Sequence, residues 1–86
     1  MPYRVDLTPR ARRDLAKLPN DAVRTAAERL ARLADEPRPR QSLKLRGGPP
    51  RWRLRFGDYR IIYTISDRDR FVAILRVVRR AESTYD

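Results

Sequence analysis

The stretch RWRLRFGDYRIIYTI, residues 51–65, decides the fold. Up to Phe56, arginine alternates with apolar residues, which is the period of a strand with one buried face. Gly57-Asp58 is typical of a two-residue turn between antiparallel strands, and a second apolar strand follows over residues 59–65. The pattern therefore predicts a β-hairpin in which Phe56 pairs with Tyr59.

A two-residue turn also fixes which side chains share a face of this hairpin, because directly paired residues point the same way. The expected pairs continue outward as Arg55 with Arg60, Leu54 with Ile61, Arg53 with Ile62, and Trp52 with Tyr63. One face, expected to pack against helices, carries Trp52, Leu54, Phe56, Tyr59, Ile61, Tyr63 and Ile65. The other face carries Arg51, Arg53, Arg55 and Arg60.

The arginines on one face indicate an anionic partner. Arg55 opposite Arg60 is a like-charge pair, and such pairs destabilise a sheet. A nucleic-acid backbone would offset the repulsion. The alternative is that arginine merely forms the solvated side of an amphipathic sheet. We favour the first interpretation, because a neutral or mixed-charge face would serve solvation better.

A third strand is expected over residues 71–78, which are apolar enough to lie centrally. Asp67-Arg68-Asp69 is a polar turn that leaves the register of this strand open. If Ile65 lies opposite Phe71, then Arg76 and Arg80 join the arginine face and Arg79 flanks it. A slip of one residue reverses this arrangement.

The N-terminal half is expected to be helical after one short strand at residues 3–7. Thr8-Pro9 starts a helix that runs to Leu18, and Asn20 is expected to cap a second helix that ends near residue 36. Residues 37–50 read as a loop, with room for a short strand at residues 42–45. The order β-αα-β-β-β predicts an α+β fold: an antiparallel sheet of about four strands, with both helices on one face.

Composition limits the chemistry. The 86 residues suit a single domain, 1–86, and include neither cysteine nor histidine, so no thiolate site and no imidazole base is available. The net charge is +10, and residues 37–86 hold 13 of the 21 basic residues but only 5 of the 11 acidic ones. No apolar run approaches the length of a membrane span and no signal region is visible, so the cytoplasm is the expected location.

The chain resembles the RelE/ParE superfamily of toxins over essentially its whole length. The hairpin from Trp52 to Tyr63 is similar to the family's WRxRxGDYRxxY pattern, which is the most specific segment. Lys44-Leu45-Arg46-Gly47 resembles its KLxG loop, and the first helix ends in Leu18-Pro19 as the family's does. The C-terminal segment, in which basic residues precede Tyr85, resembles the RelE-type ending.

The resemblance implies a toxin of a type II toxin–antitoxin system with a microbial RNase-like fold. RelE-like members cleave mRNA in the ribosomal A site and are blocked by an antitoxin that wraps around them. The expected partners are therefore a cognate antitoxin in a hetero-oligomer, mRNA and the ribosome. The resemblance carries the basic catalytic positions onto Arg53, Arg55, Arg60 and Arg79, with Arg80 as neighbour, and the terminal tyrosine onto Tyr85.

The candidate site residues follow from this chemistry. RNA can be cut by its own 2′-hydroxyl, and clustered guanidinium groups stabilise the charge that develops on phosphorus. We assign catalysis to Arg55, Arg60, Arg79 and Tyr85, and RNA binding to Arg51, Arg53, Arg76, Arg80, Lys44 and Arg46. Arginine is too basic to remove a proton, so Tyr85 or Glu82 would have to do so. No metal or cofactor is expected.

Two other functions remain open. A ParE-like inhibitor of DNA gyrase would share the fold and the hairpin but lack nuclease residues, and the missing histidine is compatible with it. A non-enzymatic basic module would bind nucleic acid in a salt-sensitive way without arresting growth.

Overall fold

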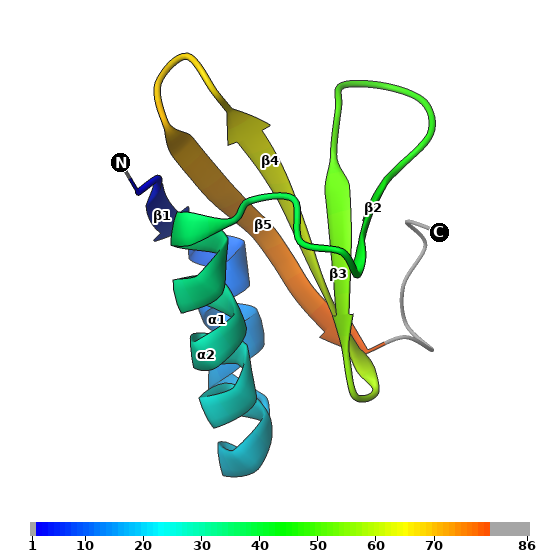
Figure 1. Cartoon of the computed structure of the whole chain (residues 1–86). Coiled ribbons are helices and arrows are strands. Elements are labelled where there is room, and N and C mark those ends of the chain that lie inside the picture. The colour runs from blue at the N-terminus through cyan, green and yellow to red at the C-terminus, as the bar shows by residue number, and fades with distance from the viewer. Residues whose placement is uncertain (1, 80–86) are drawn as a thin grey trace.

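The computed structural model describes residues 2–79 as two helices and a five-stranded sheet (Figure 1). The elements are β1 (Arg4–Leu7), α1 (Pro9–Ala16), α2 (Asn20–Asp35), β2 (Ser42–Lys44), β3 (Trp52–Phe56), β4 (Tyr59–Ser66) and β5 (Phe71–Arg79). The strand order across the sheet is β1-β5-β4-β3-β2, so the first and last strands of the chain are neighbours. None of the helices described is long and apolar enough to span a membrane.

The predicted α+β fold is confirmed, with two differences in the sheet. The segment at residues 42–44 does form a strand, β2, which pairs antiparallel with β3 and raises the strand number to five. The pairing of β1 with β5 is parallel, whereas the other three strand pairs are antiparallel as expected. Both helices lie on one side of the sheet, beside β1 and β5, and among residues 2–79 no helix lies on the opposite side (Figure 1).

The two helices begin differently. Thr8 caps α1 as predicted, because its Oγ1 accepts a hydrogen bond from the Ala11 N–H at 3.1 Å. The prediction that Asn20 caps α2 is wrong: Pro19 occupies the cap position, and Asn20 is the first helical residue. Near this end the Asp21 carboxylate accepts from the Ala22 N–H at 3.0 Å, which satisfies one of the free donors of the first turn.

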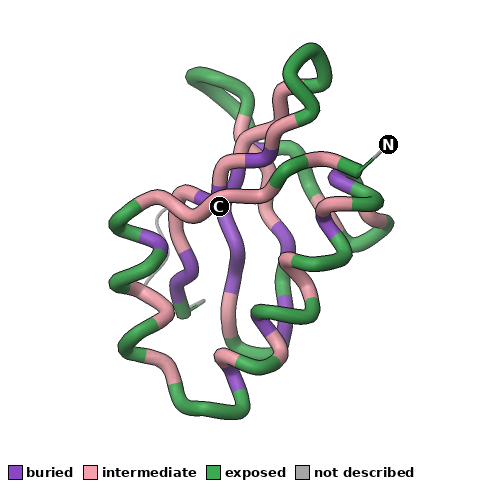
Figure 2. Tube along the Cα trace, turned by 90° about the vertical axis from the view of Figure 1, so that its left-hand side faces the viewer, coloured by how far each residue is buried: buried purple, intermediate pink, exposed green. Residues whose placement is uncertain are grey.

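The core forms where the helices meet β3, β4 and β5, and buried positions concentrate along these strands (Figure 2). All seven residues predicted to face the helices belong to it: Leu54, Phe56, Ile61 and Tyr63 are buried, and Trp52, Tyr59 and Ile65 pack against them half-buried. Ala11, Ala26 and Leu33 contribute from the helices. The hairpin pattern therefore identified the strand side of the core.

Tyr63 is the largest fully buried side chain, and its hydroxyl still has a partner. It donates to the carbonyl oxygen of Pro37 at 2.8 Å, which fixes the point where the chain leaves α2. Burial raises the pKa of the Tyr63 phenol to about 12. The residue is thus a neutral core donor.

Tyr63→Phe should lower the free energy of unfolding by about 1 kcal/mol, because it leaves a buried carbonyl without its donor. Urea denaturation of both proteins measures the difference. Tyr3→Phe is the matched control, since Tyr3 loses a bond to an exposed carboxylate, that of Asp67. A larger loss in the Tyr3 variant would contradict this account.

The register of β5 starts one residue away from the one that the sequence analysis considered, but a bulge restores the parity, so Arg76 still has the parity of the arginine face. Ile65 lies opposite Val72, not Phe71, so the strand is shifted by one residue. A bulge then follows: Tyr63 pairs with Ile74 and Ile62 with Arg76, so that Leu75 is skipped.

Helix α1 closes the edge of β5 beyond the end of β1. The pairing of β1 with β5 stops at Leu7 and Ile74. There the Thr8 N–H donates to the Ile74 carbonyl at 2.9 Å, and the Thr8 hydroxyl donates to that of Leu75 at 3.1 Å. One turn further along α1, the Asp14 carboxylate accepts from the Val77 N–H at 2.9 Å. Side chains of α1 thus take the place of a neighbouring strand.

Candidate nucleic-acid interface

The β3–β4 hairpin has the predicted register throughout. Phe56 pairs with Tyr59, and Arg55 lies directly opposite Arg60. Gly57 has φ of +53°, the left-handed conformation that glycine provides at the first position of a type II′ hairpin turn. The turn therefore brings two guanidinium groups together on the side of the sheet away from the helices.

We define the arginine face as the side of β3 and β4 that carries Arg53, Arg55 and Arg60, with Arg51 at its entrance. It is less exposed than a solvated sheet surface would be. Arg55 is exposed, but Arg60 has only 5% of its surface accessible, and its neighbour Ile62 is fully buried. The alternative that these arginines merely form the solvated side of the sheet does not fit Arg60, because Arg60 is buried.

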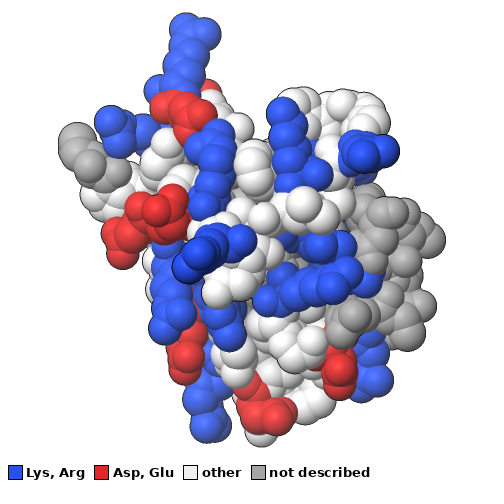
Figure 3. Space-filling view, turned by 45° about the vertical axis from the view of Figure 1, so that its right-hand side comes forward, with Lys and Arg blue, Asp and Glu red and all other residues white. Residues whose placement is uncertain are grey.

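The electrostatics of the arginine face suit an anion. The Nε atoms of Arg51, Arg53 and Arg60 are buried, and each of these arginines, like Arg55, makes an interaction within the chain. A bound phosphate would thus meet guanidinium groups that are already held in place. Basic side chains cover much of this side of the molecule, with acidic ones in only a few places (Figure 3).

Arg79 lies at the same end of the sheet as the Arg55–Arg60 pair, on the last position of β5. It pairs with Tyr59, so the register assigns it to the opposite face, and its guanidinium carbon is 5.8 Å from the Tyr59 ring centroid. The Tyr59 ring in turn stacks on Phe56 at 5.4 Å. The exposed Arg79 side chain therefore lies at the same end of the sheet as the pair but on the other face.

Arg76 pairs with Ile62 and so has the parity of the arginine face, but its guanidinium group binds a carboxylate of α1. Its Nε donates to Asp14 Oδ2 at 2.8 Å and its NH2 to Oδ1 at 3.3 Å. Burial opposes ionisation of Asp14, but the bonds from Arg76 and the Val77 N–H, with the charges of Arg76 and Arg10, outweigh it and lower the Asp14 pKa. The ion pair, and not the register, draws the Arg76 guanidinium group toward α1.

The two predicted RNA-binding residues before the hairpin lie apart from the arginine face. Lys44 pairs with Trp52 and so has the parity of the helix-facing side, while Leu43, opposite Arg53, is 50% exposed. Arg46 is exposed in the loop that follows β2. Both cations are accessible, but the register does not group them with Arg55 and Arg60.

The two candidates for proton transfer, Glu82 and Tyr85, and one predicted RNA-binding residue, Arg80, lie outside the described part of the chain. Arg80, Glu82 and Tyr85 all fall within residues 80–86. Of the tyrosines that are described, Tyr3 and Tyr63 have raised pKa values, in Tyr3 mainly because it donates to the Asp67 carboxylate. Neither phenol suits removal of a proton near neutral pH.

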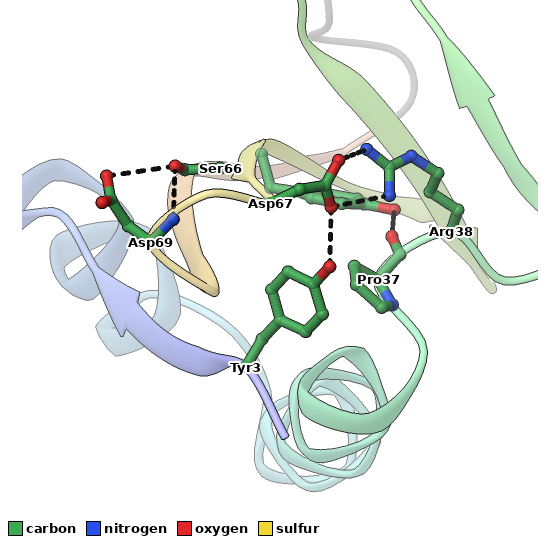
Figure 4. Close-up of polar contacts among 7 residues, drawn as sticks. Tyr3, Pro37, Arg38, Ser66, Asp67 and Asp69 are labelled. Carbon is green, nitrogen blue, oxygen red and sulfur yellow. Dashed lines mark hydrogen bonds and ion pairs between the residues drawn. The ribbon is translucent and has the colours of Figure 1, made fainter. Parts of the chain in front are cut away.

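Sequence reasoning missed a polar cluster that joins three distant segments (Figure 4). The Tyr3 hydroxyl donates to Asp67 Oδ1 at 2.6 Å, and Arg38 donates to both Asp67 oxygens at 3.1 and 2.8 Å. Arg38 also lies 5.4 Å from the Trp52 ring centroid, and its bonds lower the Asp67 pKa. No pattern in the sequence relates Arg38 to a turn residue 29 positions away.

Within residues 2–79 there is no group of three or more His, Cys, Asp or Glu side chains that could hold a metal ion. The chemistry that the described residues offer is that of clustered arginines: bidentate binding of phosphate and stabilisation of negative charge.

Comparisons with known proteins agree on one family. The family model described as "ParE toxin of type II toxin-antitoxin system, parDE" matches residues 5–84. Toxin RelG of Mycobacterium tuberculosis is 40% identical over 90 residues, which cover 95% of each chain.

Solved structures give the same result. A chain of the toxin-antitoxin complex RelBE2 from Mycobacterium tuberculosis is 39% identical with a TM-score of 0.83, covering 93% of this chain and 100% of that one. A chain of the archaeal RelE-RelB complex from Pyrococcus horikoshii OT3 is 33% identical with a TM-score of 0.84, covering 96% and 100%. With the hairpin and the α+β topology in place, these matches show that the chain belongs to the RelE/ParE superfamily of type II toxin–antitoxin toxins.

Proposed function

We propose that this toxin is an endoribonuclease that cuts mRNA on the ribosome and so inhibits translation. The observation that carries the proposal is the cross-strand pair of Arg55 and Arg60, one exposed and one buried, beside Arg53 on the same face. Two guanidinium groups on directly paired residues of one face can bind the same phosphate. The similarity to Toxin RelG and to RelE chains supports RNA as that anion.

The arginines have different roles in the proposed cleavage reaction. The RNA 2′-hydroxyl loses its proton and attacks the adjacent phosphorus, which forms a 2′,3′-cyclic phosphate. The P–O bond to the 5′-oxygen of the next nucleotide breaks, and that oxygen takes up a proton to leave as a hydroxyl. Arg55 and Arg60 stabilise the extra negative charge on the phosphoryl oxygens, and Arg79 binds from the sheet end. Arg53 assists these arginines in binding the phosphate groups of the RNA. We assign Tyr85 to base stacking or proton transfer.

We further propose that an antitoxin binds this chain in a hetero-oligomer. Its structural relatives include chains of a RelBE2 complex and of a RelE-RelB complex. The net charge of +10 suits an antitoxin with an acidic segment, which would cover the arginine face and compete with RNA for it.

Gyrase inhibition is the second candidate, favoured by the description of the matching family model, which names the parDE system. In that case the toxin would act by binding a protein, and the arginine face would serve that interface. Loss of DNA supercoiling activity without RNA cleavage would identify this function.

Primer-extension mapping of mRNA in a translating extract tests the proposal. We expect wild-type toxin to produce cuts in phase with codons, and Arg55→Ala to remove them, because Arg55 is exposed and can be replaced without disturbing the core. Intact mRNA with normal translation would contradict the proposal, and inhibition of purified gyrase would then decide for the second candidate.

A further inference from the structure

The surface of α1 carries a charge excess that the arginine face does not explain. Arg10, Arg12, Arg13 and Lys17 are all exposed on this helix or at its end. Its single acidic residue, Asp14, is occupied by Arg76 and by the Val77 N–H. The charged side chains that α1 exposes to solvent are therefore all cations.

The basic residues at the start of α1 do not stabilise the helix itself. The N-terminus of a helix carries partial positive charge and is stabilised by acidic residues. The first turn of α1 has no acidic residue and instead carries Arg10 and Arg12. By contrast α2, which is twice as long, has Asp21 in its first turn. Arg10 and Arg12 therefore weaken the start of α1 unless an anion binds there, whereas Arg13 and Lys17 lie at the other end of the helix, where cations are favourable.

Three of these cations form a stripe. At 3.6 residues per turn, Arg10, Arg13 and Lys17 fall within about 60° of one another around the axis and span about 10 Å along it. Arg12 lies on the other side of the helix. The stripe runs beside the edge of β5, because Asp14, next to it on the helix, binds the Val77 N–H there.

A hollow connects the stripe to the candidate site. It has a volume of about 120 Å³ and is lined by Asp14, Lys17, Leu18, Arg76, Val77, Val78 and Arg79. Its lining carries three cations, Lys17, Arg76 and Arg79, and one carboxylate, that of Asp14, so its charge suits a phosphate group. Of the residues that line the hollow, Lys17 belongs to the stripe. Arg79 lies at the same end of the sheet as the Arg55–Arg60 pair, so the hollow lies between the stripe and that end of the sheet.

The stripe offers nothing to an amphipathic protein segment. Such partners dock through apolar anchors, and the only exposed large hydrophobic residue among positions 2–79 is Leu43, on β2 at the far edge of the sheet. Binding of a nucleic-acid backbone needs cations and no apolar anchor.

We propose that the RNA strand that lies on the arginine face continues around the end of β5 and along α1. One phosphate occupies the hollow between Lys17 and Arg79, and the next phosphates lie on Arg13 and Arg10. The stripe accommodates about three nucleotides at the stacking distance of about 3.4 Å. This inference rests on the RNA-binding part of the proposed function and not on cleavage.

The test measures binding of full-length toxin to 2′-O-methyl oligonucleotides of increasing length, which cannot be cut. We expect wild-type affinity to rise with length until the stripe is filled. The triple variant Arg10→Gln, Arg13→Gln, Lys17→Gln should bind long strands about tenfold more weakly, bind the shortest as wild type does, and lower the salt-dependence slope by about two. The control removes equal charge elsewhere, with Arg12→Gln, Arg24→Gln and Arg32→Gln, all at exposed positions.

Each outcome of these binding measurements supports or overturns the proposed RNA path. A loss confined to the triple variant and to long strands supports the path. Equal losses in the stripe variant and the control variant would mean that only net charge matters and would overturn the proposed path. Unchanged binding by the stripe variant, Arg10→Gln, Arg13→Gln, Lys17→Gln, would also overturn the path. Loss of binding to an acidic peptide, with RNA binding intact, would assign the stripe to a protein partner. Length-dependent binding without mRNA cleavage would leave the path standing and reject only the nuclease function.

Discussion

Arg60→Ala should slow mRNA cleavage by about 10²–10³-fold, the loss typical when one preorganised donor to transition-state charge is removed. Arg60 is the member of the cross-strand pair that is held in place, since only 5% of its surface is accessible. A guanidinium that is already positioned need not reorganise when charge develops on the phosphate. The rate is best measured as single-turnover cleavage on translating ribosomes.

The burial of Arg60 requires controls for folding. Replacing the exposed Arg55 by alanine should slow cleavage by a comparable factor without lowering stability. Similar losses of cleavage rate in the two variants would show that the effect arises at the site and not from unfolding. Arg68→Ala removes an exposed arginine from the turn between β4 and β5 and should cleave as wild type does. Normal cleavage by Arg60→Ala, with the fold intact, would remove the charge-stabilisation role.

Asp14→Asn should lower the free energy of unfolding by about 3 kcal/mol. The Asp14 and Arg76 side chains are 14% and 20% exposed, so removing the carboxylate charge leaves a largely buried guanidinium uncompensated. The substitution also weakens the acceptor for the Val77 N–H. Urea denaturation at neutral pH measures the loss.

The same pair sets part of the acid sensitivity of the fold. The pKa of Asp14 is lowered in the folded protein, so its contribution is complete above the unfolded value of about 4 and is lost as the pH falls through the folded value. We expect Asp14→Asn to remove this part of the pH dependence below about pH 4. Asp67→Asn is the control, because Asp67 also has a lowered pKa but is exposed. An equal effect of the two variants would contradict a special role for Asp14.

The sequence predicted the hairpin fully but β5 only in part, and the reason lies in the turns. Gly57-Asp58 leaves one way to pair β3 with β4, so every pair from Phe56 outward could be counted. The turn at 67–70 allows more than one register, and the skipped residue Leu75 is dictated by contacts with α1 that no local pattern records. The same limit hid the parallel pairing of β1 with β5.

For the candidate site, the sequence predicted which residues meet but not how deeply they lie. Alternation placed Arg55 opposite Arg60, and the structure confirms it. Alternation cannot say that Arg60 is buried, because burial depends on what else covers that face. The pairing of Arg76 with Asp14 joins positions 62 residues apart, and only the packing of α1 on β5 brings them together.

The place of β5 between β1 and β4 has a consequence for biosynthesis. During translation the N-terminal strand emerges first, yet its partner is the last strand to leave the ribosome. Until then the growing chain can form its helices and the β3–β4 hairpin, but β1 has no neighbour and the core stays open. The arginine face therefore reaches its final form only after β5 has left the ribosome and inserted between β1 and β4.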